Sequence, residues 1–194
     1  MLAMWGGLYA FTLAFFMRPF WFRKFPRLSY TKLIVLAIGL HLFFAMFITW
    51  GQYYVWQSNQ FTQIFLSLPL PGEAPLPYLL EWTRRYFEHP FGYFAYYSFG
   101  HFWLELINLF TVTGIFYGVL KFWQFYRAGF LSEGPEIILL LSLLVGWPGV
   151  LLFIPAGLVL SVLFYVFLYT RGERRVHLEP VFMFLAPFLL FLRN

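Results

Sequence analysis

The chain has 194 residues, of which 61% are hydrophobic and only 11% are charged, with a formal net charge of +5 at pH 7. This composition excludes a soluble globular domain and predicts an all-α, polytopic membrane bundle of about six transmembrane helices. The absence of cysteine excludes disulfides, thiolate metal sites and cysteine nucleophiles, and all eight acidic residues are glutamates, so no mechanism can use an aspartate.

Residues 2–17 form the first expected span, and a basic loop follows it. The loop carries five positive charges and no acid, which is typical of the cytoplasmic side of a membrane protein. Aromatic side chains interleave with these charges, so we expect the loop to lie on anionic lipid and not to bind nucleic acid. Its basic residues are Arg18, Arg23, Lys24, Arg27 and Lys32.

The second expected span covers residues 33–50, with His41 near its middle. Trp50, Tyr53, Tyr54 and Trp56 follow as an aromatic belt of the kind found at a membrane surface. Residues 51–98 are then more polar and rich in proline, which predicts an ordered extracytoplasmic loop with a short helix near residues 79–88.

The third expected span, residues 99–120, holds the most polar helical face of the sequence. His101, Glu105 and Asn108 are spaced so that they share one face of a helix. Together with His41 they could hold a divalent metal or relay a proton, or they could only form hydrogen bonds between helices. Because an ionised carboxylate is costly in lipid, Glu105 is expected to point into the bundle, towards the second span.

A helical hairpin is expected next, with arms at residues 131–146 and 149–170 joined by Gly-Trp-Pro-Gly, and a last span at residues 176–192. Glu133 and Glu136 lie at the mouth of the first arm. They are candidates for a carboxylate pair in acid-base chemistry, and the alternative is that they are first-turn acids favoured by the helix dipole.

Charge asymmetry then predicts the topology. Basic residues gather on the loops assigned to the cytoplasm, which supports both termini on the extracytoplasmic side of a plasma membrane. On this layout the inner basic residues are 18, 23, 24, 27, 32, 121, 127, 171, 174 and 175, and the outer ones are 84, 85 and 193.

Residues 133–192 resemble the C-terminal half of a prepilin leader peptidase. The resemblance rests on Glu-Gly-Pro-Glu, on the Gly-Trp-Pro-Gly turn and on the final Pro187-Phe188-Leu189. It implies a helical membrane domain and a peptidase that uses two acids sharing a proton about a water. Glu136 falls where the family has one motif aspartate and Pro135 where it has a glycine, while the second aspartate has no counterpart. The resemblance therefore implies a degenerate member that lacks the catalytic aspartates.

Three functions follow as hypotheses. The first is a non-catalytic membrane scaffold or accessory subunit without a cofactor, whose partners are the lipid bilayer and another membrane protein or a second copy of the chain. The second is an intramembrane hydrolase or peptidase, or a metal-dependent membrane enzyme, that uses Glu133 and Glu136 or His101 and Glu105. The third is proton or ion conduction along the polar face. No residue is assigned as catalytic or as a metal ligand.

Overall fold

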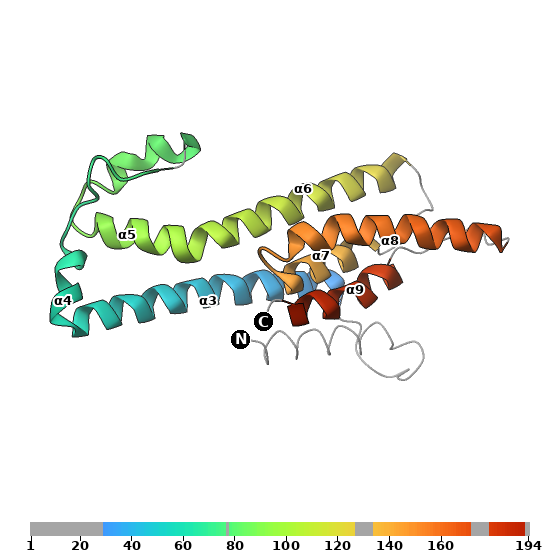
Figure 1. The fold of residues 1–194 in the computed structure, drawn as a ribbon, viewed down its shortest axis with the longest axis horizontal. Coiled ribbons are helices and arrows are strands. Elements are labelled where there is room, and N and C mark those ends of the chain that lie inside the picture. The colour runs from blue at the N-terminus through green and yellow to red at the C-terminus, as the bar shows by residue number, and fades with distance from the viewer. Residues whose placement is uncertain (1–28, 77, 127–133, 172–178, 193–194) are drawn as a thin grey trace. The chain divides into compact units, whose positions relative to one another are not determined.

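The computed structural model of the chain describes residues 29–76, 78–126, 134–171 and 179–192 (Figure 1). Over these ranges the chain is helical and contains no strand, which confirms the predicted all-α class. Three of the described helical stretches are long and apolar enough to cross a membrane, and they suggest membrane association. They are Tyr30–Ser58, Gly92–Tyr126 and Val150–Thr170.

Some of the residues singled out in the sequence lie outside the described ranges. They are the first expected span at 2–17, most of the basic loop, Glu133 and the start of the last expected span. Lys32 is the described member of the basic loop, and its side chain is exposed in the first turn of a helix. The undescribed members of the loop are Arg18, Arg23, Lys24 and Arg27.

The described helices belong to two compact units. One unit is Leu40–Ile107, and the other combines the chain up to Gly39 with the chain from Asn108 onward. Helix α3 (Tyr30–Ser58) and helix α6 (Leu104–Tyr126) each contribute residues to both units.

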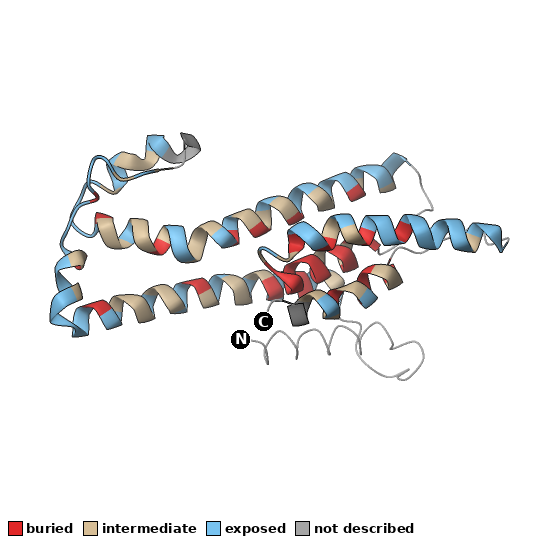
Figure 2. Cartoon of the chain, in the orientation of Figure 1, coloured by how far each residue is buried: buried red, intermediate tan, exposed pale blue. Residues whose placement is uncertain are grey.

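The core of the second of these units is α7 (Gly134–Val145), which contacts α8 (Val150–Thr170) and α9 (Glu179–Leu192). Nearly every side chain of α7 is buried (Figure 2). Its 12 residues span only about 18 Å, against about 30 Å for the hydrocarbon of a bilayer. The helix is therefore a short core element covered by its neighbours.

The turn from α7 into α8 depends on Gly146. Its φ is 71°, a left-handed conformation in which a side chain would be strained. The Gly146 amide still donates to the carbonyl of Ser142 over 3.1 Å, and the Gly146 carbonyl accepts from the amide of Val150 over 2.9 Å. These bonds satisfy the end of α7 and start α8 four residues later.

α8 and α9 approach each other closely at Gly157. A β-carbon added there would lie 2.2 Å from a ring atom of Phe182, whose side chain is fully buried. The same ring meets Phe153 edge-on, with 5.3 Å between the ring centroids. Glycine at position 157 therefore leaves a notch in α8 that the Phe182 ring fills.

Beyond this notch, most side chains of α8 are not covered by the rest of the described chain, although Ser161 is buried. Val159, Val162 and Leu163 are each about three-fifths exposed, at 59%, 62% and 60%. Figure 2 shows the exposed residues continuing along this half of the helix. A helix that is apolar on all sides is normally surrounded by lipid or by other helices.

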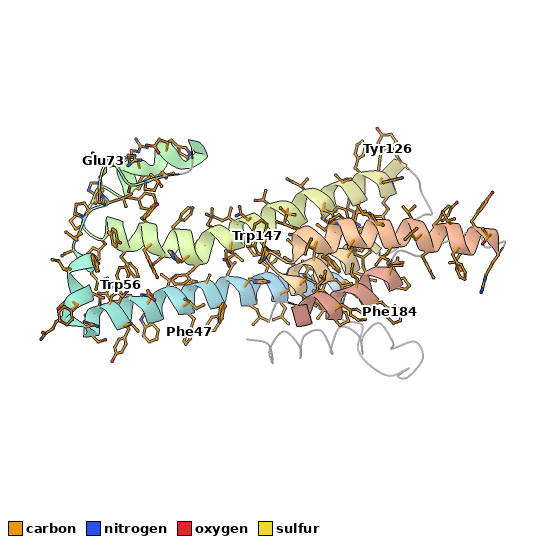
Figure 3. All side chains as sticks on the ribbon, in the orientation of Figure 1. Phe47, Trp56, Glu73, Tyr126, Trp147 and Phe184 are labelled. Carbon is orange, nitrogen blue, oxygen red and sulfur yellow. The ribbon has the colours of Figure 1, made fainter. Side chains whose placement is uncertain are left out.

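In the unit Leu40–Ile107, aromatic rings hold the helices together. Trp56 is buried between α3 and α5 (Gly92–Ser98; Figure 3), and its ring centroid lies 5.0 Å from that of Tyr97 and 5.4 Å from that of Phe94. The sequence places Trp56 in an interfacial belt, but α3 continues to Ser58 and carries it into this cluster. Trp50 is 65% exposed.

The region expected as a loop contains short helices. An arginine holds it together: Arg84 donates from Nη1 to the carbonyl of Gly72 over 2.6 Å and from Nη2 to the carbonyl of Ala74 over 3.0 Å. Its Nε donates to Glu81 over 2.5 Å, and this hydrogen bond holds the pKa of Glu81 below its usual value. The short helices before α5 are α4 (Gln60–Gln63), η1 (Ile64–Leu66) and η2 (Tyr78–Tyr86).

The chain then runs from α5 into η3 (Phe99–Trp103), a π-helical stretch that leads into α6. The indole nitrogen of Trp103 in this stretch donates to Thr49 of α3, with 3.1 Å between Nε1 and Oγ1. This hydrogen bond satisfies the only polar atom of the indole side chain.

The close approach at Gly157 predicts a specific loss of stability. Gly157→Ala should lower the free energy of unfolding by about 1 to 3 kcal/mol, because the buried Phe182 ring has to move. In the control Gly118→Ala, nothing lies within 4 Å of the new β-carbon. That variant should keep its stability or gain up to about 1 kcal/mol from helix propensity.

Unfolding of the purified protein in mixed micelles measures both changes. Adding Phe182→Leu to Gly157→Ala should recover part of the loss, because leucine lacks the ring edge that clashes. If both glycine substitutions changed the free energy of unfolding equally, the close fit of Phe182 against Gly157 would be contradicted.

Candidate functional site

Among the glutamates that the structure describes, Glu136 is the one that lies at the start of the buried helix α7. It lies in the first turn of α7, directly after Pro135, where the partial positive charge of the helix N-terminus favours a carboxylate. Its side chain is 20% exposed, so it lies partly inside the unit. The packing of α7 thus carries this carboxylate to the edge of an apolar core.

Lys121 of α6 forms an ion pair with Glu136 through Oε1. The ammonium also donates to the side-chain oxygen of Gln124 over 3.1 Å and lies 5.7 Å from the centroid of the Tyr117 ring. Tyr117, Lys121 and Gln124 are three or four residues apart, so they share one face of α6. The ammonium of Lys121 therefore contacts a carboxylate from α7 and an amide and an aromatic ring from its own helix.

The second oxygen of Glu136 has a different environment. Oε2 is buried and accepts no hydrogen bond from the residues that the structure describes. A carboxylate has lone pairs on both oxygens, and buried polar atoms are normally hydrogen-bonded to protein or water. Glu136 thus presents one oxygen that is bound to Lys121 and one that can still accept a hydrogen bond.

The sequence identifies Glu136 but not its partner. Lys121 is interpreted there only as a cytoplasmic charge at the end of the third span, and Glu133, the expected partner, lies outside the described residues. The order of the charges along the chain is the sequence signal that could have revealed this partner. Lys121 is the first charge after the long apolar stretch that follows Glu105, and Glu136 begins the next apolar stretch. Two charges at the ends of adjoining apolar helices are good candidates for a pair.

The polar face expected on the third span is arranged differently. His101 lies within the π-helical stretch, and its side chain and that of Glu105 are exposed, whereas Asn108 is half-buried. The sequence predicts that Glu105 points into the bundle. Leu106 and Leu109 occupy the buried side of this helix instead, at 6% and 2% exposure, and this turns Glu105 outward.

The second expected span contributes His41, whose side chain is half-buried on α3. Within the described residues, no group of three or more histidine, aspartate, glutamate or cysteine side chains lies close enough to hold a metal ion.

The ion pair predicts a coupling between Lys121 and Glu136. Lys121→Met should destabilise the protein more than Glu136→Gln, because it leaves a partly buried carboxylate without its counter-charge. The double variant should lose less than the sum of the two, with a coupling energy of about 0.5 to 3 kcal/mol in unfolding measurements.

Lys32→Met serves as the control for the loss of a lysine, since Lys32 is exposed, and it should change stability by less than about 0.5 kcal/mol. Additive losses from the two single variants would show that the pair contributes nothing to folding.

Comparisons with protein-family models, with curated proteins and with solved structures found no match for this chain. The resemblance of residues 133–192 to prepilin leader peptidases stays a prediction from their motifs. The contacts of Glu136 are the physical basis on which a function can be assigned.

Proposed function

We propose that this chain is a multi-pass protein of the plasma membrane that acts as a non-catalytic scaffold or accessory subunit. The observation that carries the proposal is the ion pair between Lys121 and Glu136. In a peptidase with two acids, the motif carboxylate shares a proton with the second acid about a water. Here the carboxylate at the corresponding position binds an ammonium group. That contact suits a structural charge pair that fixes α6 against α7.

The uncovered half of α8 supports a role in assembly. It exposes large apolar side chains on several sides, including Val162, Phe167 and Tyr169 at 62%, 50% and 63%. Lipid can cover such a surface, and so can the helix of another membrane protein or of a second copy of this chain. The partners of the proposed subunit are therefore the bilayer and a further membrane helix.

One observation favours the enzymatic alternative. The buried Oε2 of Glu136 has no partner among the described residues, so it is able to accept a hydrogen bond from a water or from a second carboxylic acid. An intramembrane hydrolase or peptidase that uses Glu133 and Glu136 would need such an atom. This second candidate is separated from the first by the glutamine experiment below.

The proposed topology has both termini on the extracytoplasmic side. The natural chain lacks cysteine, so single cysteines can be introduced without removing others. Cysteines at Gln60 and Asn194 should react with a membrane-impermeant maleimide from outside intact cells, and a cysteine at Ser29 should react only after the cells are opened. Ser29 and Gln60 are both exposed, which makes their reactivities comparable. Labelling of Ser29 in intact cells would overturn the layout.

The scaffold and the enzyme differ in what they predict for the double variant Glu133→Gln with Glu136→Gln. A scaffold should keep its complex, whereas an enzyme would lose its activity. Glutamine keeps the size and the hydrogen-bonding oxygen of each side chain. At Glu136 the change should cost a helix-dipole contribution of about 0.3 to 1 kcal/mol, together with the coupling to Lys121 of about 0.5 to 3 kcal/mol. We expect the double variant to remain folded and to keep the mass of its complex on native electrophoresis of solubilised membranes.

We also expect the wild-type protein not to cleave a prepilin-like substrate. Glu88→Gln, in an exposed position outside this site, is the control. Cleavage by the wild type that is abolished in the double variant and kept in the control would establish the enzyme instead.

A further inference from the structure

A half-open pocket of about 440 Å³ lies in the unit Leu40–Ile107, away from Glu136 in the chain. One wall is made by α5, the π-helical stretch and the start of α6. The other is made by the segment before η2, which runs alongside α5 in Figure 1. Small-molecule sites in proteins usually measure about 300 to 1,000 Å³ and are mainly apolar with a few polar groups. The residues used below are Pro75, Tyr96, Tyr97, His101 and Leu104.

The outer wall of the pocket is held in place by hydrogen bonds. The hydroxyl of Tyr96 donates to the carbonyl of Pro75 over 2.5 Å, which ties the segment directly to α5. Arg84 binds the carbonyls of Gly72 and Ala74 just before it. The pocket therefore exists before a ligand arrives, and little ordering would be needed on binding.

The inner wall combines an aromatic face with one imidazole. The rings of Tyr97 and His101 are stacked, with 4.1 Å between their centroids and 19° between their planes. His101 lies in the π-helical stretch, and π-helical turns within α-helices occur frequently at functional sites. A flat ring has aromatic surface to lie against in this pocket.

The hydrogen bond of His101 fixes which ring nitrogen is left to accept a hydrogen bond. Nδ1 lies 3.0 Å from the carbonyl oxygen of Tyr97, and a carbonyl can only accept, so Nδ1 carries the proton. In the neutral imidazole Nε2 is then an acceptor without hydrogen. His101 therefore selects a ligand that donates a hydrogen bond, such as a hydroxyl group.

The rim of the pocket continues into apolar surface. Leu104 lines the pocket, and Ile107, three residues later on the same side of α6, is 45% exposed. In a chain that lies in a membrane, an apolar tail attached to the ligand can follow this side into lipid. A ring, a hydroxyl group and an apolar tail together describe one class of membrane compound.

We propose that this pocket binds the hydroxyl-bearing ring of a reduced membrane quinone, with one ring hydroxyl donating to Nε2 of His101. The oxidised form of the same ring has carbonyl groups in place of the hydroxyls, so it offers Nε2 no donor. The pocket should therefore prefer the reduced form over the oxidised form. This binding is independent of the role proposed for Glu136.

The preference can be measured without any variant. The purified protein in lipid nanodiscs is titrated by calorimetry with a decyl-tailed benzoquinone and, under anaerobic conditions, with the corresponding hydroquinone. One neutral hydrogen bond predicts about 3- to 10-fold tighter binding of the hydroquinone. A titration with tail-free hydroquinone distinguishes a site for soluble phenols from a site for a lipid quinol. If the site takes a lipid quinol, the tail-free compound should bind more weakly than the decyl compound.

Three variants test whether Nε2 of His101 causes the preference for the reduced form. His101→Phe keeps a ring that can stack on Tyr97 but removes Nε2, so both forms should bind with the same, weaker affinity. His89→Phe, at an exposed position outside the pocket lining, should leave affinity and preference unchanged. Arg84→Met, which loosens the outer wall, should weaken both forms equally and keep the preference.

Three results would overturn the proposal. They are no saturable binding of either decyl compound, equal binding of the two forms by the wild type, and a preference that survives in His101→Phe. Tighter binding of tail-free hydroquinone than of the decyl compound would overturn the assignment to a lipid quinol.

Discussion

The 12 described residues of α7 are shorter than the hydrocarbon of a bilayer is thick, so this helix requires protein around it. This requirement explains why its side chains are the most completely buried of the described chain. α8 and α9 both contact it, and the left-handed Gly146 lets α8 turn back at once.

The same short helix determines where a charge can be kept. The first turn of α7 has backbone amides without partners in the helix, and its dipole favours a negative group there. Glu136 occupies that position, and Lys121 neutralises it from α6. A carboxylate alone at the edge of an apolar core would be costly, whereas the paired one joins two helices. Its second oxygen, Oε2, is buried and has no hydrogen-bond partner among the described residues.

Composition and apolar length were enough to predict the helical class, because those properties are carried by each segment alone. The extent of α3 was not predicted, since Tyr53, Tyr54 and Trp56 have the composition of a membrane-surface belt, and only contacts with residues 93–97 show that Trp56 is buried. Glu105 illustrates a second limit. The cost of a charge in lipid suggested an inward position, but Leu106 and Leu109 fill the buried side of that helix. Lys121 and Glu136 meet across helices, and no periodicity within one segment reveals such a pair.

The fit of Phe182 into the notch at Gly157 also bears on how the protein is made. α8 precedes α9 in the chain, so the ribosome delivers the notch before the ring that fills it. During that interval Phe153, which the Phe182 ring later covers at its edge, lacks this neighbour. The hairpin of α7 and α8 can form first, but its final packing has to wait for α9. The order of synthesis thus determines that the packing of this core is completed only when α9 has been made.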